Sequence, residues 1–218
     1  MVAGKLSSEL IRRNARPVWC PVNQVVLDSR LRRLGAGVVT QNDSELLYAT
    51  VELSSYEIVM LFDEVSVLAL RDAALEIADG NDALAKRALQ ASQIDICCFA
   101  PLVPMVADKL GLQAKYVPFD ATPSAILNIL TLNNTRSMAN ARALLLKPHR
   151  EVLESSGGEN NVVRDTSWDC ELARCLREDA KMDVARVTAY RVCARDAAEW
   201  RLERDWYESG HFDVVWMA

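Results

Sequence analysis

The strongest constraint in the sequence is a regular alternation of short apolar segments with amphipathic segments. Apolar runs bounded by polar or turn-forming residues predict buried strands. The segments that predict strands are 18–20, 57–62, 94–99, 115–118, 142–146, 184–190 and 212–216. Helical segments separate most of them, so neighbouring strands have to pair in parallel through β-α-β crossovers. The sequence therefore predicts an α/β fold with a doubly wound sheet, whose ligand sites lie at the carboxyl ends of the strands.

The amphipathic segments carry apolar residues at helical spacing and residues typical of helix ends. The expected helices are 23–34, 65–78, 82–91, 101–110, 122–130, 167–179 and 195–209. In the first of them, Leu27, Leu31 and Leu34 repeat at i, i+4 and i+7, which places them on one helical face. Thr122 followed by Pro123 is typical of a helix N-cap and first position. Residues 155–161 are polar and glycine-rich, and we expect a loop there.

Composition and charge exclude several classes of protein. Of the 218 residues, 50% are hydrophobic and 25% are charged, which is typical of a globular chain. No apolar run approaches the ~20 residues that a membrane helix needs. The net charge of −5 argues against bulk binding to nucleic acid or to an anionic membrane. We therefore expect neither nucleic acid nor a membrane among the partners.

Cysteine usage and the first residues bear on localisation. The chain has six cysteines and two histidines, and no C-x-x-C pair, so no zinc site is expected. Reduced thiols are typical of the cytoplasm, which is the expected location. Residues 1–16 lack the apolar region of a secretory signal peptide, and the alternative, a mitochondrial transit segment, is short.

The common nucleotide and nucleophile motifs are absent from the sequence. No G-x-G-x-x-G follows a predicted strand, and neither a P-loop nor a G-x-S-x-G elbow is present. We therefore expect no cofactor and no metal. Any chemistry would depend on acid–base and electrostatic catalysis by side chains.

The order of several segments resembles the uroporphyrinogen-III synthase family across residues 17–218. The matching segments are RLRRLG and GVV (30–35, 37–39), YEIVML (56–61), ICCFAPLV (96–103), ADKLGL (107–112), YVP (116–118), RALLL (142–146), VARVTAYR (184–191) and GHFDVV (210–215). The resemblance implies a cofactor-free hydro-lyase that closes the linear tetrapyrrole hydroxymethylbilane and inverts its last ring. This would place the protein in haem biosynthesis.

The resemblance also implies two parallel-sheet, Rossmann-like lobes with the substrate in a cleft between them. Residues 1–45 and 195–218 would form the first lobe, and residues 48–192 the second. Family members continue beyond the position that matches Ala218, so the first lobe is expected to be incomplete. A terminal strand at 212–216 would present an unprotected edge, which favours a homodimer or a partner chain.

Tyr190 is the residue that the resemblance implies in catalysis. It ends a predicted strand and matches the family tyrosine that helps the substrate hydroxyl leave, and a phenol can donate a proton to a leaving oxygen. The alternative is a structural tyrosine with a buried ring and a hydrated hydroxyl.

Six further residues are candidates for substrate binding. Three are cations at or after strand ends, suited to the carboxylates of the substrate, although each alone is also compatible with a surface charge. The other three match family positions near the cleft, where Ser124 is also a typical helix-start residue. The candidates are Lys147, Arg150, Arg191, Ser124, Leu102 and Val103.

The sequence also departs from the family pattern. The family's Phe-Thr-Ser triplet falls on Leu61, Phe62 and Asp63, so both hydroxyls are lost. The glycine and threonine of its VGxxT segment fall on Ala100 and Val103. These losses favour a second hypothesis, a degenerate relative that binds a tetrapyrrole or acts as an interaction partner without turnover. A third is an unrelated α/β binding domain.

Overall fold

The computed structural model describes residues 12, 23–27, 45–132, 138–150, 167–194, 201, 205 and 208–209. The chain divides into two compact units, a discontinuous one of Met1–Gln24 with Cys193–Ala218 and a continuous one of Val25–Val192. In the discontinuous unit Arg201, Asp205 and Glu208 are helical, as the expected helix 195–209 requires at these positions. The segments 18–20 and 212–216 lie outside the described residues, and so does the expected terminal-strand edge.

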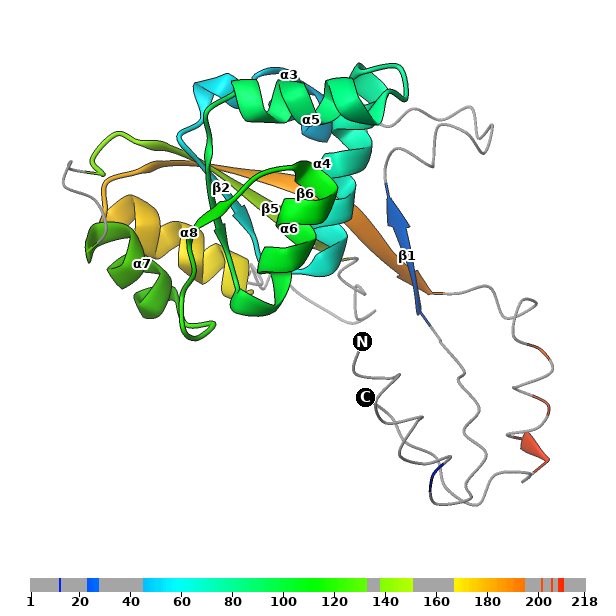
Figure 1. Cartoon of the computed structure of the whole chain (residues 1–218). Coiled ribbons are helices and arrows are strands. Elements are labelled where there is room, and N and C mark those ends of the chain that lie inside the picture. Colours follow the sequence, from blue (N-terminus) through cyan, green and yellow to red (C-terminus); the bar gives the residue numbers. More distant parts are fainter. Residues whose placement is uncertain are drawn as a thin grey trace. The chain divides into compact units, whose positions relative to one another are not determined.

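A six-stranded sheet in the order β1-β6-β5-β2-β3-β4 forms the centre of the continuous unit (Figure 1). Its strands are β1 (Asn23–Leu27), β2 (Ile58–Leu61), β3 (Asp95–Cys98), β4 (Ala114–Tyr116), β5 (Arg142–Arg150) and β6 (Asp183–Ala194). The pairings β6-β5, β5-β2, β2-β3 and β3-β4 are all parallel. The predicted parallel α/β fold is therefore confirmed, whereas the two-lobe synthase-like architecture stays a prediction.

Helices cover both faces of the sheet, as crossover connections between parallel strands require. The first layer holds α3 (Glu45–Val51), α4 (Glu64–Ile77), α5 (Asp82–Ala91) and α6 (Val103–Leu110), with the short 3₁₀ turns η3 (Leu53–Ser55) and η4 (Ala100–Leu102). The second layer holds α7 (Pro123–Leu132) and α8 (Trp168–Glu178). Figure 1 shows α7 and α8 on one side of the strands, and α4 and α6 on the other.

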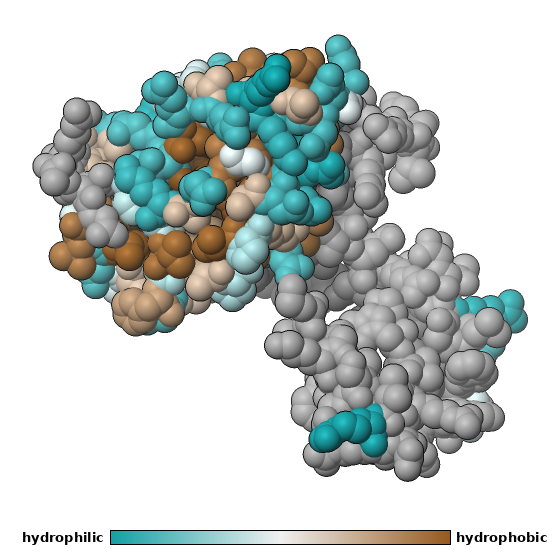
Figure 2. Space-filling view, in the orientation of Figure 1, coloured by the Kyte–Doolittle hydropathy of each residue, from teal (hydrophilic) through white to brown (hydrophobic). Residues whose placement is uncertain are grey.

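Alternate residues of β2 are buried on opposite faces of the sheet, each face against one of the two helical layers. Val59 and Leu61 join the core under α3–α6, while Ile58 and Met60 join the core under α7 and α8, and all four are at most 1% exposed. Strands buried on both faces have to be apolar throughout, which explains why 57–62 could be recognised in the sequence. Figure 2 shows that apolar residues, in brown, also gather on the surface along α7, where Leu132 is 83% exposed.

Side-chain caps define where the helices begin. The Asp63 carboxylate accepts from the Ser66 backbone N–H at 2.7 Å at the start of α4. The Thr122 hydroxyl oxygen accepts from the Ala125 N–H at 3.2 Å, which confirms the cap expected before Pro123. A glycine defines where α6 ends: Gly111, its C-cap, adopts φ +68°, a left-handed conformation that favours glycine.

Two segments differ from the sequence-based expectations. Residues 23–27 form strand β1 and not the start of a helix, so this prediction was wrong. The consecutive β-branched residues Val25 and Val26 favour extended backbone, and pairing beside β6 satisfies its hydrogen bonds; the leucine spacing alone did not reveal this. In addition, α3 was not expected at all, because its Glu45–Val51 sequence is short and lacks a strong start signal.

No helix of the described part of the chain combines the length and apolar character needed to span a membrane.

We predict that truncating a central core side chain strongly destabilises the continuous unit. Leu145 on β5 is fully buried between β2 and β6, so Leu145→Ala should lower the free energy of unfolding by about 2–5 kcal/mol. Urea unfolding followed by circular dichroism measures the change. The control Leu132→Ala, on an exposed side chain, should change it by less than about 0.5 kcal/mol. Equal effects would contradict the assigned core.

Candidate functional site

The order of the strands reverses between β2 and β5. From β2 the chain proceeds through β3 to β4 on one side, and then crosses back to place β5 and β6 on the other. As a result α4, which follows β2, and α8, which follows β5, lie on opposite faces of the sheet. In open α/β sheets ligands bind beyond the carboxyl ends of the strands at such a reversal. The carboxyl ends of β2 and β5 are therefore the candidate site.

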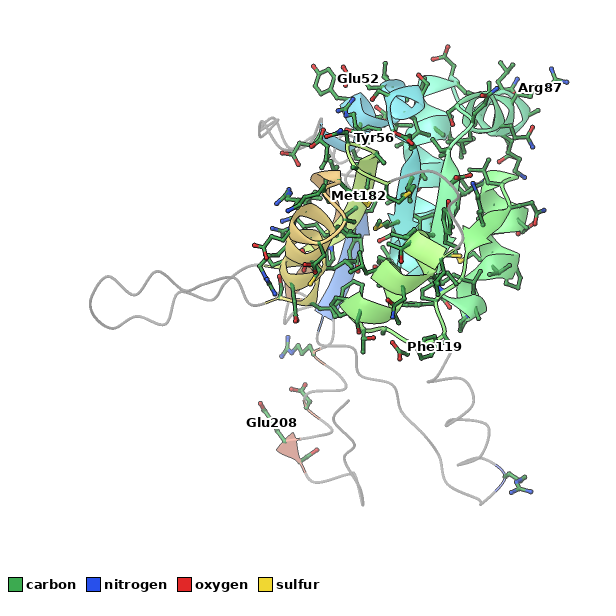
Figure 3. The ribbon with its side chains drawn as sticks, turned by 90° about the vertical axis from the view of Figure 1, so that its left-hand side faces the viewer. Glu52, Tyr56, Arg87, Phe119, Met182 and Glu208 are labelled. Carbon is green, nitrogen blue, oxygen red and sulfur yellow. The ribbon has the colours of Figure 1, made fainter. Side chains whose placement is uncertain are left out.

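Figure 3 distinguishes the two ends of the sheet. Tyr56 and Met182, which precede β2 and β6, lie toward the upper end of the unit in this view. Phe119, which follows β4, lies at the opposite end and marks the carboxyl ends of the strands. Its ring is 86% exposed, the largest fraction of any described large hydrophobic residue.

Three aromatic rings meet at the carboxyl ends, and we call them the aromatic cluster: Phe62 after β2, Phe99 after β3 and Trp168 at the start of α8. The Phe62 ring centroid lies 4.8 Å from that of Phe99, with the rings tilted by 40°. It lies 5.0 Å from that of Trp168, in an edge-to-face arrangement at 86°. Aromatic pairs favour these separations and tilts. All three side chains are half-buried, so the cluster rests on the core and still reaches the surface.

The indole of Trp168 is held by a hydrogen bond that it donates to a neighbouring loop. Its Nε1–H donates to the Ala121 carbonyl at 2.5 Å, across 47 positions of sequence. This bond ties the first turn of α8 to the loop between β4 and α7. It satisfies the polar edge of a half-buried ring and fixes the orientation of that ring.

A partly buried ion pair lies beside the cluster. Arg186 of β6 donates to the Asp169 carboxylate, in the first turn of α8, at 2.6 Å, and the two side chains are 22% and 14% exposed. Burial raises the pKa of Asp169, but hydrogen bonds from Arg186 and Ser167 outweigh it and hold that pKa below its usual value. The carboxylate thus stays charged at neutral pH and fastens α8 to the sheet.

Lys147 is the one predicted substrate-binding cation whose side chain is described. Met60 of β2 and Leu145 of β5 are register partners and face α7 and α8. Phe62 lies two residues after Met60, and Lys147 lies two residues after Leu145. Side-chain alternation therefore puts Phe62 and Lys147 on the face that carries α7 and α8. Lys147 is half-buried, and no carboxylate of the described residues forms an ion pair with it. It is therefore available to an anionic ligand.

Tyr190 lies on the strand next to Lys147 but on the other face of the sheet. The β5-β6 register passes from Lys147 opposite Thr188 to Pro148 opposite Tyr190, so β6 has a bulge at Ala189. Bulges re-aim side chains. Tyr190 is 8% exposed and packs with the core under α3–α6. Lys147 and Tyr190 therefore lie on adjacent strands but on opposite faces of the sheet.

The remaining candidates lie at the same end of the sheet. Arg150 is the register partner of Val192, and Arg191 that of His149, so both arginines come from the far ends of β5 and β6; their side chains lie outside the described residues. Leu102 and Val103, at the end of η4 and the start of α6, follow β3.

Two of these positions have local structural roles. Leu102 is 6% exposed and part of the core, and its backbone N–H donates to the Phe99 carbonyl at 2.9 Å, so its role is structural. Ser124 is exposed in the first turn of α7, where its hydroxyl donates to that of Thr122 at 3.2 Å. Asp63 likewise has a cap role, because its two carboxylate oxygens accept from the N–H and the hydroxyl of Ser66.

The buried thiols of β3 are unsuited to nucleophilic chemistry. Burial and the neighbouring Cys98 raise the pKa of Cys97 to about 12, and burial raises that of Cys98 to about 11. Such thiols stay protonated at neutral pH and behave as small hydrophobic groups. Among the described residues, no group of three or more His, Cys, Asp and Glu side chains is arranged to hold a metal ion.

Sequence reasoning missed the aromatic cluster. The sequence predicts Phe62 and Phe99 as the last residues of strands, and Trp168 as part of a helix. The signal that could have found them is positional: each phenylalanine directly follows a buried strand, and Trp168 follows a helix cap. Such positions converge at one edge of a parallel sheet.

The sequence matches no protein-family model, and no curated protein is significantly similar to it. The resemblance to uroporphyrinogen-III synthases therefore depends on the segments quoted above and stays a prediction.

We predict that the Asp169–Arg186 pair stabilises the fold in a pH-dependent way. Asp169→Asn should lower the free energy of unfolding at pH 7 by about 1.5–3 kcal/mol. Because the folded pKa of Asp169 lies below its unfolded value, this contribution is complete above about pH 4 and is lost as the pH falls through the folded pKa. Urea unfolding of both proteins between pH 7 and pH 3 measures it.

The matched control for this experiment is the exposed pair on the same helix. Arg174 and Glu178 lie at i, i+4 with more than half of each side chain exposed, so Glu178→Gln should cost less than about 1 kcal/mol. A difference between wild type and Asp169→Asn that does not shrink at low pH would contradict the assigned role of the pair.

We also predict that Cys97 and Cys98 resist alkylation in the folded protein. Their raised pKa values and burial suppress the reactive thiolate. Iodoacetamide at pH 7.5, followed by peptide mass spectrometry, should label the partly exposed Cys170 and Cys175 at least tenfold faster. Rapid labelling of Cys97 before unfolding would show that β3 is more accessible than the structure indicates.

Proposed function

We propose that the protein acts on a linear tetrapyrrole, as a uroporphyrinogen-III-synthase-like hydro-lyase that cyclises hydroxymethylbilane with inversion of the last ring. The observation that supports this best is the path of the chain. It passes from a discontinuous unit into a continuous parallel α/β unit and back again, crossing within β1 and within β6. The resemblance implies a chain of this kind, with the first boundary near residue 45, whereas the contacts divide it at Gln24 and Val25.

In this proposal Tyr190 and the three cations have chemical roles. The Tyr190 hydroxyl protonates the substrate hydroxyl as its C–O bond breaks with electrons from the pyrrole nitrogen, so that the oxygen leaves as water. The exocyclic carbon then forms the ring-closing C–C bond to the last pyrrole ring, and the proton which that ring loses returns to the Tyr190 phenolate. Lys147, Arg150 and Arg191 bind the acetate and propionate arms through charge-assisted hydrogen bonds. Leu102, Val103 and Ser124 lie at the same end of the sheet, but they are not assigned as donors: the Leu102 and Val103 N–H groups donate to the carbonyls of Phe99 and Ala100, and the Ser124 hydroxyl donates to that of Thr122. No cofactor takes part.

A cytoplasmic location belongs to the same proposal. The four described cysteines Cys97, Cys98, Cys170 and Cys175 are all free thiols, which is typical of a reducing compartment.

A second candidate function is favoured by the surroundings of β2. Where the resemblance places the family's two hydroxyls, Phe62 packs into the aromatic cluster and Asp63 caps α4. Neither position retains a hydroxyl donor for a carboxylate. The alternative is therefore a relative that binds a tetrapyrrole, or a protein partner, without turnover.

The proposal predicts formation of uroporphyrinogen III. Purified protein should convert freshly made hydroxymethylbilane so that isomer III exceeds the isomer I of the protein-free control, as resolved by chromatography after oxidation. Tyr190→Phe should lower the rate by roughly 10²- to 10⁴-fold, because it removes the proton donor and keeps the ring. The matched control Tyr48→Phe changes an exposed tyrosine of α3 and should not alter the rate.

The outcomes separate the two candidate functions. Formation of isomer I alone would overturn the enzymatic proposal, and binding of uroporphyrin in the same preparation would then support the non-catalytic relative. Isomer III formed at an unchanged rate by Tyr190→Phe would exclude Tyr190 from the mechanism.

A further inference from the structure

We infer that the aromatic cluster is a ring-binding subsite, in which Phe62, Phe99 and Trp168 receive the flat face of one pyrrole ring while Lys147 binds a carboxylate arm of that ring. This inference rests on the proposed tetrapyrrole ligand and assigns part of its binding. Of its four residues, only Lys147 is already a substrate-binding candidate, and the three aromatic residues are new assignments.

The first argument is the position and exposure of the cluster. Its rings come from the ends of β2 and β3 and from the start of α8, which converge at the reversal of strand order where ligands of such sheets bind. Their inner edges pack on the core formed by residues such as Met60 and Ile126, and the rings remain half-exposed. Exposed aromatic surface at a ligand-binding edge favours a flat, apolar ligand face.

The second argument is that the cluster is pre-organised. The hydrogen bond from Trp168 to the Ala121 carbonyl fixes the indole, and the edge-to-face contact with Phe62 fixes the neighbouring ring. The Asp169–Arg186 ion pair holds the first turn of α8, from which Trp168 projects, against β6. Rings held in this way lose little conformational entropy when a ligand binds.

The third argument is charge complementarity. Lys147 lies on the same face of the sheet as Phe62, two residues beyond a pair of register partners, and is half-buried with no ion-pair partner among the described carboxylates. A pyrrole that carries acetate and propionate arms presents a flat electron-rich ring next to an anion. An aromatic wall beside one cation matches both features.

Binding of uroporphyrin I, a flat octacarboxylate, tests the inference. Fluorescence titration should give a dissociation constant roughly five- to tenfold weaker for Phe99→Leu and for Trp168→Leu than for wild type, because the variants keep apolar volume and lose a ring face. Trp168→Phe, which retains a ring, should bind more tightly than Trp168→Leu. Tyr48→Leu, an exposed aromatic residue of the opposite helical layer, is the matched control and should bind as wild type does.

A competitor that carries carboxylates but no ring distinguishes the contribution of the pyrrole ring to binding from that of the carboxylates. Propane-1,2,3-tricarboxylate should compete with uroporphyrin I equally well in wild type and in the leucine variants, and less well in Lys147→Gln. If wild type binds uroporphyrin I and both leucine variants bind as tightly, the ring subsite is overturned and the proposed function stands. If wild type binds no uroporphyrin I, the subsite is overturned, while formation of isomer III from hydroxymethylbilane still decides the proposed function.

Hydrogen exchange supplies a measurement that needs no substitution. With uroporphyrin I bound to wild type, backbone amides directly after Phe62 and Phe99 should exchange more slowly, while those of α3 should not change. Binding without added protection at these two positions would overturn the inference even if the leucine variants failed to fold.

Discussion

The parallel pairing of β2 with β3 and β5 is the constraint on which the rest of the structure depends. Ile58, Val59 and Met60 each have register partners on both sides, and all three are at most 1% exposed. A strand with no exposed face or edge cannot tolerate polar residues in its interior. Polar and aromatic side chains are therefore excluded from the centre of the sheet and collect where the strands end.

The edge at the carboxyl ends gains its character from this exclusion. The strands carry different side chains at their carboxyl ends. An aromatic residue follows β2 and another follows β3, whereas β5 carries Lys147 in its second half. Because the order of strands reverses between β2 and β5, no crossover helix covers the ends of both. The same topology that fixes the core thus brings apolar rings and a cation together at a surface.

Sequence patterns predicted the elements that are determined by local signals or by complete burial. The strand 57–62, the helix 82–91 and the cap at Thr122 have such causes, and the structure agrees with them. The strand at Asn23–Leu27 could not be predicted, because its conformation depends on pairing beside β6, a partner more than a hundred residues away. The extra length of β5 and β6 likewise comes from their mutual pairing and not from apolar sequence, since Pro148 and His149 would not indicate a strand.

The sequence was sufficient to predict that the candidate site lies at the strand ends, but not on which face of the sheet each side chain lies. Lys147 and Tyr190 were recognised as residues near strand ends, yet the bulge at Ala189 decides that they occupy opposite faces, and no single-strand pattern records a bulge formed against a neighbour. This separation bears on the class of ligand. A small molecule bound beside Lys147 and the aromatic cluster is divided from Tyr190 by the sheet itself. Under the proposed function, the linear tetrapyrrole would have to pass around the strand ends to reach both residues.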